Sequence, residues 1–236
     1  MSLTAENITN SLELPATGRK VVTKERVVNE FARITQYVTW PFIYIIFNFF
    51  YCLKIQGREN FKNIQRPFVI IANHVDPYHS FVFRLVLGPA TPHLPLRFMA
   101  VTKFEWKSLN FLASIGVIDF VYSLFGVFTI VPGLGIDKNL EKARDIIKAG
   151  GSIVIYPEGK INDKGGVAPF KKGAAVLIKE TGVSTIPVSF RLGRRNFWWR
   201  ELTVNVGKPI LISKNNSVEK ITDIFHKEVA ELYENK

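Results

Sequence analysis

Two apolar runs in this sequence each lead into a side chain that can exchange a proton. Residues 68–73 run directly into His74, and residues 152–156 run into Pro157, Glu158 and Gly159. Each run has the length of a buried strand bounded by turn residues. Open α/β sheets bind their ligands at the carboxyl ends of their strands. A base and an acid are therefore expected to share one cleft.

The order and spacing of these residues resemble the lysophospholipid acyltransferase family. The first motif of that family is Asn-His, four residues and Asp, and its third motif is an aromatic residue followed by Pro-Glu-Gly. The matching segments here begin at Asn73 and at Tyr156. The resemblance extends from about Ile55 to Ile210 and includes softer matches at residues 102–105, 126–130, 170–174, 185–188 and 206–210.

The resemblance implies a glycerolipid acyltransferase-like fold and a reaction. A fatty acyl group would move from a thioester of coenzyme A or acyl-carrier protein to a lysophospholipid or a related alcohol. His74 would be the general base, because a neutral imidazole can take a hydroxyl proton near pH 7. A lone histidine after a strand is otherwise often a structural residue. Neither a covalent acyl-enzyme nor a cofactor is expected.

The first motif departs from the family pattern at its last position. The aspartate that orients the base in the family is replaced here by His79, which can accept a hydrogen bond but brings no negative charge. Asp76 is the nearest carboxylate and Asp119 a more remote one. Asp76 is the favoured substitute, so the predicted catalytic residues are His74, Asp76 and His79. Alternatively, Asp76 only caps a turn, and the chain is a catalytically impaired lipid-binding homologue.

The predicted substrate-binding residues follow from the same resemblance. Glu158 would bind or position the polar head of the acceptor, although a turn carboxylate bonded to local backbone is the alternative. Gly159 would let the backbone approach a ligand closely. The complete predicted set is Asn73, Lys103, Glu158, Gly159 and Lys160.

Two arginines that grip a glycerol phosphate in the family are missing. The second motif continues as Val131-Pro132, and the third as Lys160-Ile161. A lysine cannot reproduce the bidentate phosphate recognition of an arginine. The third motif instead resembles the tafazzin-like lysophospholipid branch, which leaves the acceptor open.

Composition limits the class of protein. A chain of 236 residues with 47% hydrophobic content fits one α/β domain plus a short appendage, and its single cysteine, Cys52, excludes a disulfide framework. The net charge of +11 indicates an anionic partner. The aromatic residues lie in apolar runs, which disfavours a nucleic-acid groove. The four scattered histidines predict no metal site.

Three segments are expected along the chain: a flexible tail at 1–18, a basic lead-in with a membrane-inserting helix at 19–53, and an acyltransferase domain at 54–236. The uncharged stretch 38–53 is shorter than the about 20 residues that span a bilayer. It is expected to enter one leaflet, on the cytoplasmic face. A core helix of the domain is the alternative. A basic aromatic cluster, residues 191–200, suits either a membrane interface or a hairpin with core tryptophans.

From residue 54 onward, apolar strand runs alternate with helical patterns. This alternation predicts an α/β domain with a mixed, mostly parallel central sheet flanked by helices. Strands are expected at 67–73, 96–102, 128–131, 152–156, 184–190 and 201–206. Helices are expected from an N-cap at Asp137 to Gly150, from Gly173 to Glu180, and over about 218–233.

Overall fold

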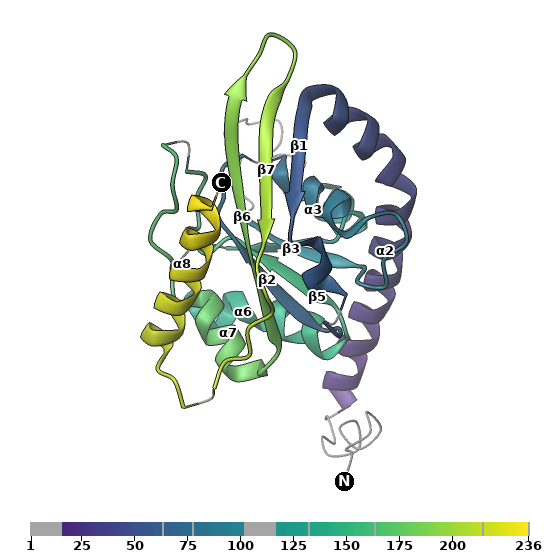
Figure 1. Ribbon diagram of the computed structural model, residues 1–236. Coiled ribbons are helices and arrows are strands. Elements are labelled where there is room, and N and C mark those ends of the chain that lie inside the picture. Colours follow the sequence, from purple (N-terminus) through teal and green to yellow (C-terminus); the bar gives the residue numbers. More distant parts are fainter. Residues whose placement is uncertain are drawn as a thin grey trace.

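The computed structural model describes residues 16–62, 64–76, 78–101, 117–131, 133–162, 164–213 and 215–235 (Figure 1). Seven strands form one sheet in the order β1-β7-β6-β2-β5-β3-β4. Only the β6–β7 pair is antiparallel, and every other neighbouring pair is parallel. The strands are β1 (Tyr51–Gln56), β2 (Phe68–Ala72), β3 (Leu96–Val101), β4 (Val127–Ile130), β5 (Ser152–Ile155), β6 (Ser184–Arg195) and β7 (Arg200–Val206). The expected mixed, mostly parallel sheet is confirmed.

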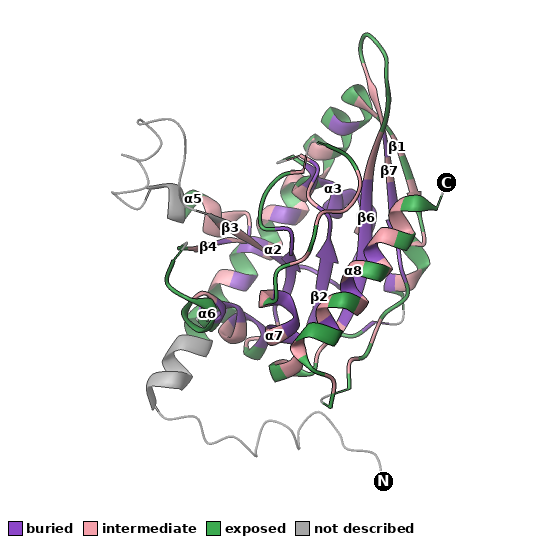
Figure 2. Cartoon of the chain, turned by 90° about the vertical axis from the view of Figure 1, so that its left-hand side faces the viewer, coloured by how far each residue is buried: buried purple, intermediate pink, exposed green. Residues whose placement is uncertain are grey.

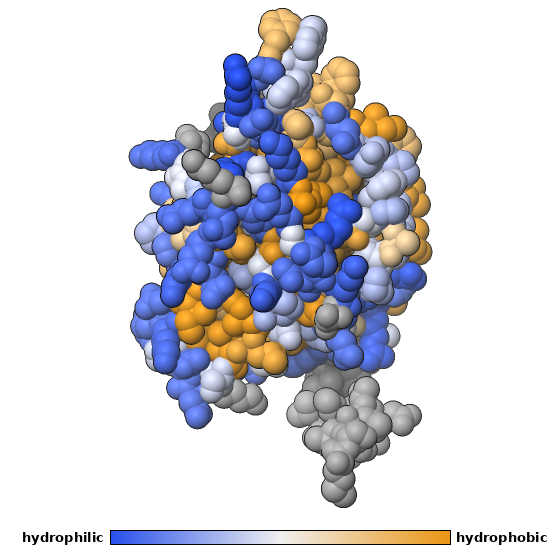
Figure 3. All heavy atoms as spheres, in the orientation of Figure 1, coloured by the Kyte–Doolittle hydropathy of each residue, from blue (hydrophilic) through white to orange (hydrophobic). Residues whose placement is uncertain are grey.

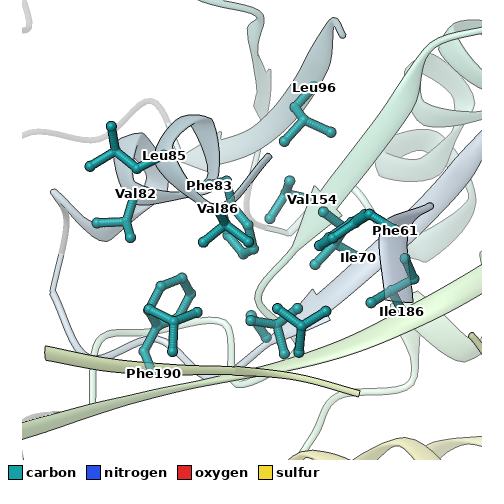
Figure 4. Packing of buried hydrophobic residues seen from close by; sticks show 14 of the residues in the cluster. Phe61, Ile70, Val82, Phe83, Leu85, Val86, Leu96, Val154, Ile186 and Phe190 are labelled. Atoms are coloured by element: carbon teal, nitrogen blue, oxygen red, sulfur yellow. The ribbon is translucent and has the colours of Figure 1, made fainter. Parts of the chain in front are cut away.

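The central strands are buried on both faces. Every residue of β2 and of β5 is buried, as is usual for parallel strands covered by helices on both sides (Figure 2). Successive side chains point to opposite faces, so Ile70 packs in one core cluster and Ile71 in the other. Figure 4 shows Ile70 and Val154 in the same packed cluster as Phe83 of α3. The carboxyl end of this buried strand leads directly into Asn73 and His74.

Helices cover the two faces of the sheet. The helices are α2 (Ala16–Phe50), the short 3-10 helix η1 (Arg58–Phe61), α3 (His79–Leu87), α5 (Val117–Leu124), α6 (Ile136–Lys148), α7 (Gly173–Thr181) and α8 (Val218–Glu234). The last three supply one core cluster, while α3 and the later turns of α2 supply the other. Figure 1 shows α2 running along the whole side of the domain.

Helix α2 is tied to the domain by buried polar contacts. The fully buried guanidinium of Arg97 on β3 donates to Asn29 at 2.7 Å and to Glu25 at 3.3 Å. The side chain of Gln36 accepts from the backbone N–H of Leu96 at 3.0 Å and donates to its C=O at 2.7 Å. One face of this segment is therefore part of the domain core. Its other face is exposed and apolar, with Phe42 at 65%.

We expect Glu25→Ala to lower the free energy of unfolding by about 3 kcal/mol, because Arg97 would remain as a buried cation without a counter-charge. Urea denaturation followed by circular dichroism measures this. Glu30→Ala is the matched control: Glu30 pairs with Arg33 on the exposed surface, and such pairs contribute about 1 kcal/mol or less. Equal losses for both variants would contradict a stabilising role of the buried pair.

The six expected strands are confirmed to within one residue at their starts, and β6 continues to Arg195 beyond its expected end. Strand β1 was not expected, because its first residues were assigned to the apolar helix. Its alternating half-buried and exposed residues show the period-2 pattern of a strand. The N-cap of α6 is Gly135, so the expectation for Asp137 is wrong, and that carboxylate lies in the first turn. Within the described ranges, no helix is long and apolar enough to cross a bilayer.

Candidate active site

Asn73 extends the pairing of β2 with β6 by one residue through its side chain. Its Oδ1 accepts from the backbone N–H of Phe190 at 2.7 Å, and its Nδ2 donates to the C=O of Phe190 at 2.9 Å. The residue is fully buried. Both polar ends of the amide are thus engaged by β6, and the chain is held where it turns into His74.

Glu158, after β5, holds the main chain of His74 in place. One carboxylate oxygen accepts from the backbone N–H of His74 at 3.3 Å, and the other accepts from that of Ala168 at 3.0 Å. The N–H of Asn162 donates to the C=O of His74 at 2.7 Å. The carboxylate is bonded to backbone, as in the alternative stated above, and burial raises its pKa. As expected, His74 and Glu158 lie next to each other at the adjacent carboxyl ends of β2 and β5.

The imidazole of His74 lies against an aromatic ring. It stacks on Tyr156 with ring centroids 4.2 Å apart, and the Tyr156 hydroxyl lies 2.9 Å from the Ser80 hydroxyl. Burial lowers the pKa of His74, while the nearby charge of Asp76 raises it. The Nδ1 atom is buried, and no described residue bonds to it. The ring is therefore neutral near pH 7 and can act as a base.

His79 begins α3 in apolar surroundings. Its ring stacks on Phe190 at 5.4 Å and meets the Tyr51 ring edge-on at 6.0 Å. The residue is fully buried, and neither ring nitrogen has a partner among the described residues. Burial lowers its pKa to about 4, so His79 is uncharged at neutral pH. It carries no charge that could stabilise a protonated His74.

Asp76 lies between the two histidines in sequence and acts on both through its charge. Its Oδ1 accepts from the backbone N–H of Tyr78 at 2.8 Å, which is the turn contact that a short acidic side chain favours. The negative charge raises the pKa of His74 and of His79. No hydrogen bond joins the His74 ring to Asp76 or His79 in the part of the chain that is described. Asp76 therefore acts on the His74 ring through its charge and not through a hydrogen bond.

A lysine that the sequence analysis did not single out lies over the third motif. Gly159 has φ +67°, and a Cβ there would lie 2.5 Å from the Nζ of Lys171 and 2.8 Å from its Cε. The backbone N–H of Lys171 donates to Pro157 at 2.8 Å, which fixes its position. Lys160 is exposed, and Lys103 lies outside the described residues. The sequence signal that could have indicated Lys171 is the pair of lysines in the softer match to the family at residues 170–174.

An apolar hollow of about 600 Å³ opens next to Asp76. The end of α2 forms one wall and the β6–β7 hairpin forms the other. Figure 3 shows apolar residues gathered between these two elements. The hollow is lined by Ile43, Ile46, Phe47, Phe50, Tyr51, Asp76, Tyr78, Phe81, Arg195, Asn196, Phe197, Trp198, Trp199 and Arg200. Its size and lining suit an alkyl chain whose polar end lies near Asp76 of the first motif.

Comparisons with known proteins agree with this geometry. A family model described as Acyltransferase matches residues 52–191. A chloroplastic 1-acyl-sn-glycerol-3-phosphate acyltransferase of Brassica napus is 29% identical over 59% of this chain and 37% of its own length. Human 1-acyl-sn-glycerol-3-phosphate acyltransferase beta is 30% identical over 61% of this chain and 49% of its own length. The chain thus spans about half or less of these relatives.

A solved structure shows the same fold. The crystal structure of the 1-acyl-sn-glycerophosphate acyltransferase PlsC from Thermotoga maritima aligns with a TM-score of 0.56 at 18% identity. The alignment covers 97% of this chain and 88% of that one.

Proposed function

The chain belongs to the Acyltransferase family, and we propose that it transfers a fatty acyl group from an acyl thioester to the free hydroxyl of a lysophospholipid. The observation that carries this proposal is the half-buried imidazole of His74, whose backbone N–H donates to Glu158 and which lies two residues before Asp76 in the lining of an apolar hollow. The similarity to 1-acyl-sn-glycerol-3-phosphate acyltransferases supports the acceptor class.

The reaction needs one proton to travel through the imidazole. His74 takes the proton of the acceptor hydroxyl as its oxygen attacks the thioester carbonyl. The C–S bond then breaks, an ester remains, and the thiolate takes the proton from the imidazolium. The chain's own contribution is to hold the base by backbone bonds to Glu158 and by the stacked ring of Tyr156. A charge at Asp76 favours the transient imidazolium.

The donor in this proposal is acyl-CoA or acyl-carrier protein, and the site of action is the cytoplasmic face of a membrane. The net charge of +11 supports an anionic donor, whether phosphates or an acidic carrier. The exposed apolar face of α2 supports a lipid surface. A catalytically impaired lipid-binding homologue is the second candidate, favoured by the lack of any bond from a described carboxylate to the His74 ring.

Product profiling of purified full-length protein tests the proposal. The protein is incubated with mixed lysophospholipids and either acyl-CoA or acyl-carrier protein, and the products are identified by mass spectrometry. We expect diacyl products that depend on a donor. Lipid binding without any product would favour the impaired homologue and overturn the enzyme proposal.

We also propose that Lys171 contacts the acceptor phosphate, because its ammonium lies over Gly159 and has no ion-pair partner among the described residues. Lys171→Met is expected to raise the KM for lysophospholipid about tenfold and to change kcat little, since a lost charged hydrogen bond costs about 1.5 kcal/mol or more. Steady-state kinetics measures both. The neighbouring Lys172 pairs with Glu219 at 2.6 Å, so Lys172→Met is the control. Equal KM values for the two variants would show that Lys171 does not contact the acceptor phosphate.

A further inference from the structure

The β6–β7 hairpin presents aromatic rings to solvent at its tip. Phe197 is 87% exposed and Trp198 is 70% exposed, and their rings meet edge-on with centroids 4.5 Å apart. The turn is closed by the backbone N–H of Asn196, which donates to the C=O of Trp199 at 2.8 Å. Figure 1 shows this tip extending beyond the rest of the sheet. Two large rings held in water on a protruding turn indicate a surface that is covered in the working protein.

The flanks of this tip are cationic. Arg191, Arg194, Arg195 and Arg200 lie on the two strands, against the single carboxylate of Glu201. Glu201 lies 3.9 Å from Lys54, and none of the four arginines has an ion-pair partner in the described part of the chain. Aromatic rings bordered by unpaired arginines match a bilayer interface, where rings lie at headgroup depth and cations meet phosphates.

A second apolar element lies across the hollow from the tip. The last turns of α2 expose Phe42 at 65%, Ile45 at 65% and Phe49 at 65%. The C-terminal end of α2 and the hairpin tip lie at the same end of the molecule (Figure 1). The hollow that they flank contains Asp76 in its lining, two residues from His74. A lipid that enters between the two elements would reach the catalytic motif directly.

We propose that the tip of the β6–β7 hairpin inserts into an anionic leaflet beside the last turns of α2, so that the hollow opens onto the bilayer. A protein partner fits less well, because two protruding rings offer far less area than the about 800 Å² per partner of a stable interface. Anionic headgroups would supply the negative counter-charge that the four arginines lack among the described residues. This inference deepens the proposed function, because it names the surface from which the acceptor enters.

Vesicle flotation with the full chain tests the inference. Neutral phosphatidylcholine vesicles are compared with vesicles that also contain phosphatidylglycerol. The double variant Phe197→Ser/Trp198→Ser removes the exposed rings, and we expect its binding to the anionic vesicles to weaken roughly tenfold or more. Leu211→Ser is the matched control, because Leu211 is 76% exposed but lies outside the hairpin and the hollow lining. Thermal unfolding of both variants confirms that the fold is retained.

The arginines are tested separately. Arg191→Gln/Arg194→Gln should weaken binding to anionic vesicles at low salt and leave binding to neutral vesicles unchanged. The reason is that these arginines attract the negatively charged headgroups electrostatically. If Phe197→Ser/Trp198→Ser binds anionic vesicles as well as Leu211→Ser does, the inference is overturned. Wild-type protein that binds neutral and anionic vesicles equally well would also overturn the inference.

Failure of the inference can be told apart from failure of the proposed function. Acyl transfer to a short-chain, soluble lysophospholipid needs no bilayer, so it tests the enzyme alone. Transfer without hairpin-dependent vesicle binding overturns the inference only. Hairpin-dependent binding without transfer supports the membrane surface and overturns the enzyme.

Discussion

His74→Ala is expected to reduce acyl transfer by about three orders of magnitude, because general-base catalysis contributes roughly 10²- to 10⁴-fold. The side chain stacks on Tyr156 and makes no hydrogen bond to a described residue through its ring, so its removal should disturb the fold little. Single-turnover rates with acyl-CoA and a soluble lysophospholipid measure the loss. His226→Asn, at another partly buried histidine, is the control and should stay within a few-fold of wild type.

The pH profile gives an independent readout of the same assignment. Activity requires the neutral imidazole, so it falls as the pH drops through the pKa of His74. Burial places this pKa below the ordinary value of 6.5, and the acid limb of the wild-type profile is expected there. A His74→Ala enzyme with activity within a few-fold of wild type and unchanged thermal unfolding would falsify the assignment.

The meeting of His74 and Glu158 could be predicted from the sequence because both residues follow fully buried runs. Parallel strands covered on both faces appear as continuous apolar segments, and β2 and β5 turned out to be neighbours in the sheet. Their carboxyl ends therefore lie together. The backbone bond from His74 to the Glu158 carboxylate, at 3.3 Å, is the direct result.

The direction of individual side chains could not be predicted in this way. Glu158 turns toward the backbone N–H groups of His74 and Ala168, and the latter donor comes from a loop ten residues farther along. Lys171 reaches Gly159 only because the loop before α7 folds back onto Pro157. Such contacts depend on loop paths, for which local periodicity holds no signal. The uncharged stretch 38–53 likewise concealed the start of strand β1, because its apolar residues run on without a break from the helix into the strand.

Asp76→Asn is expected to slow acyl transfer about a hundredfold, because Asp76 is the only carboxylate among the described residues whose charge acts on the His74 ring. The amide oxygen of asparagine can still accept from the backbone N–H of Tyr78, so the turn should be retained. The pKa of His74 should fall further when the raising charge is gone. The acid limb of the pH profile should therefore move to lower pH, a shift that a purely structural role of Asp76 would not produce.

His79→Asp restores the usual family residue and is expected to have little effect on the rate. The new carboxylate would be buried between Phe190 and Tyr51, where no described donor bonds to the present ring. Desolvation would raise its pKa and lower the stability of the fold. If His79 itself limits catalysis, the same substitution would instead raise turnover, and adding it to Asp76→Asn would rescue activity. Equal rates for wild type, Asp76→Asn and the double variant would show that no carboxylate in the first motif assists His74.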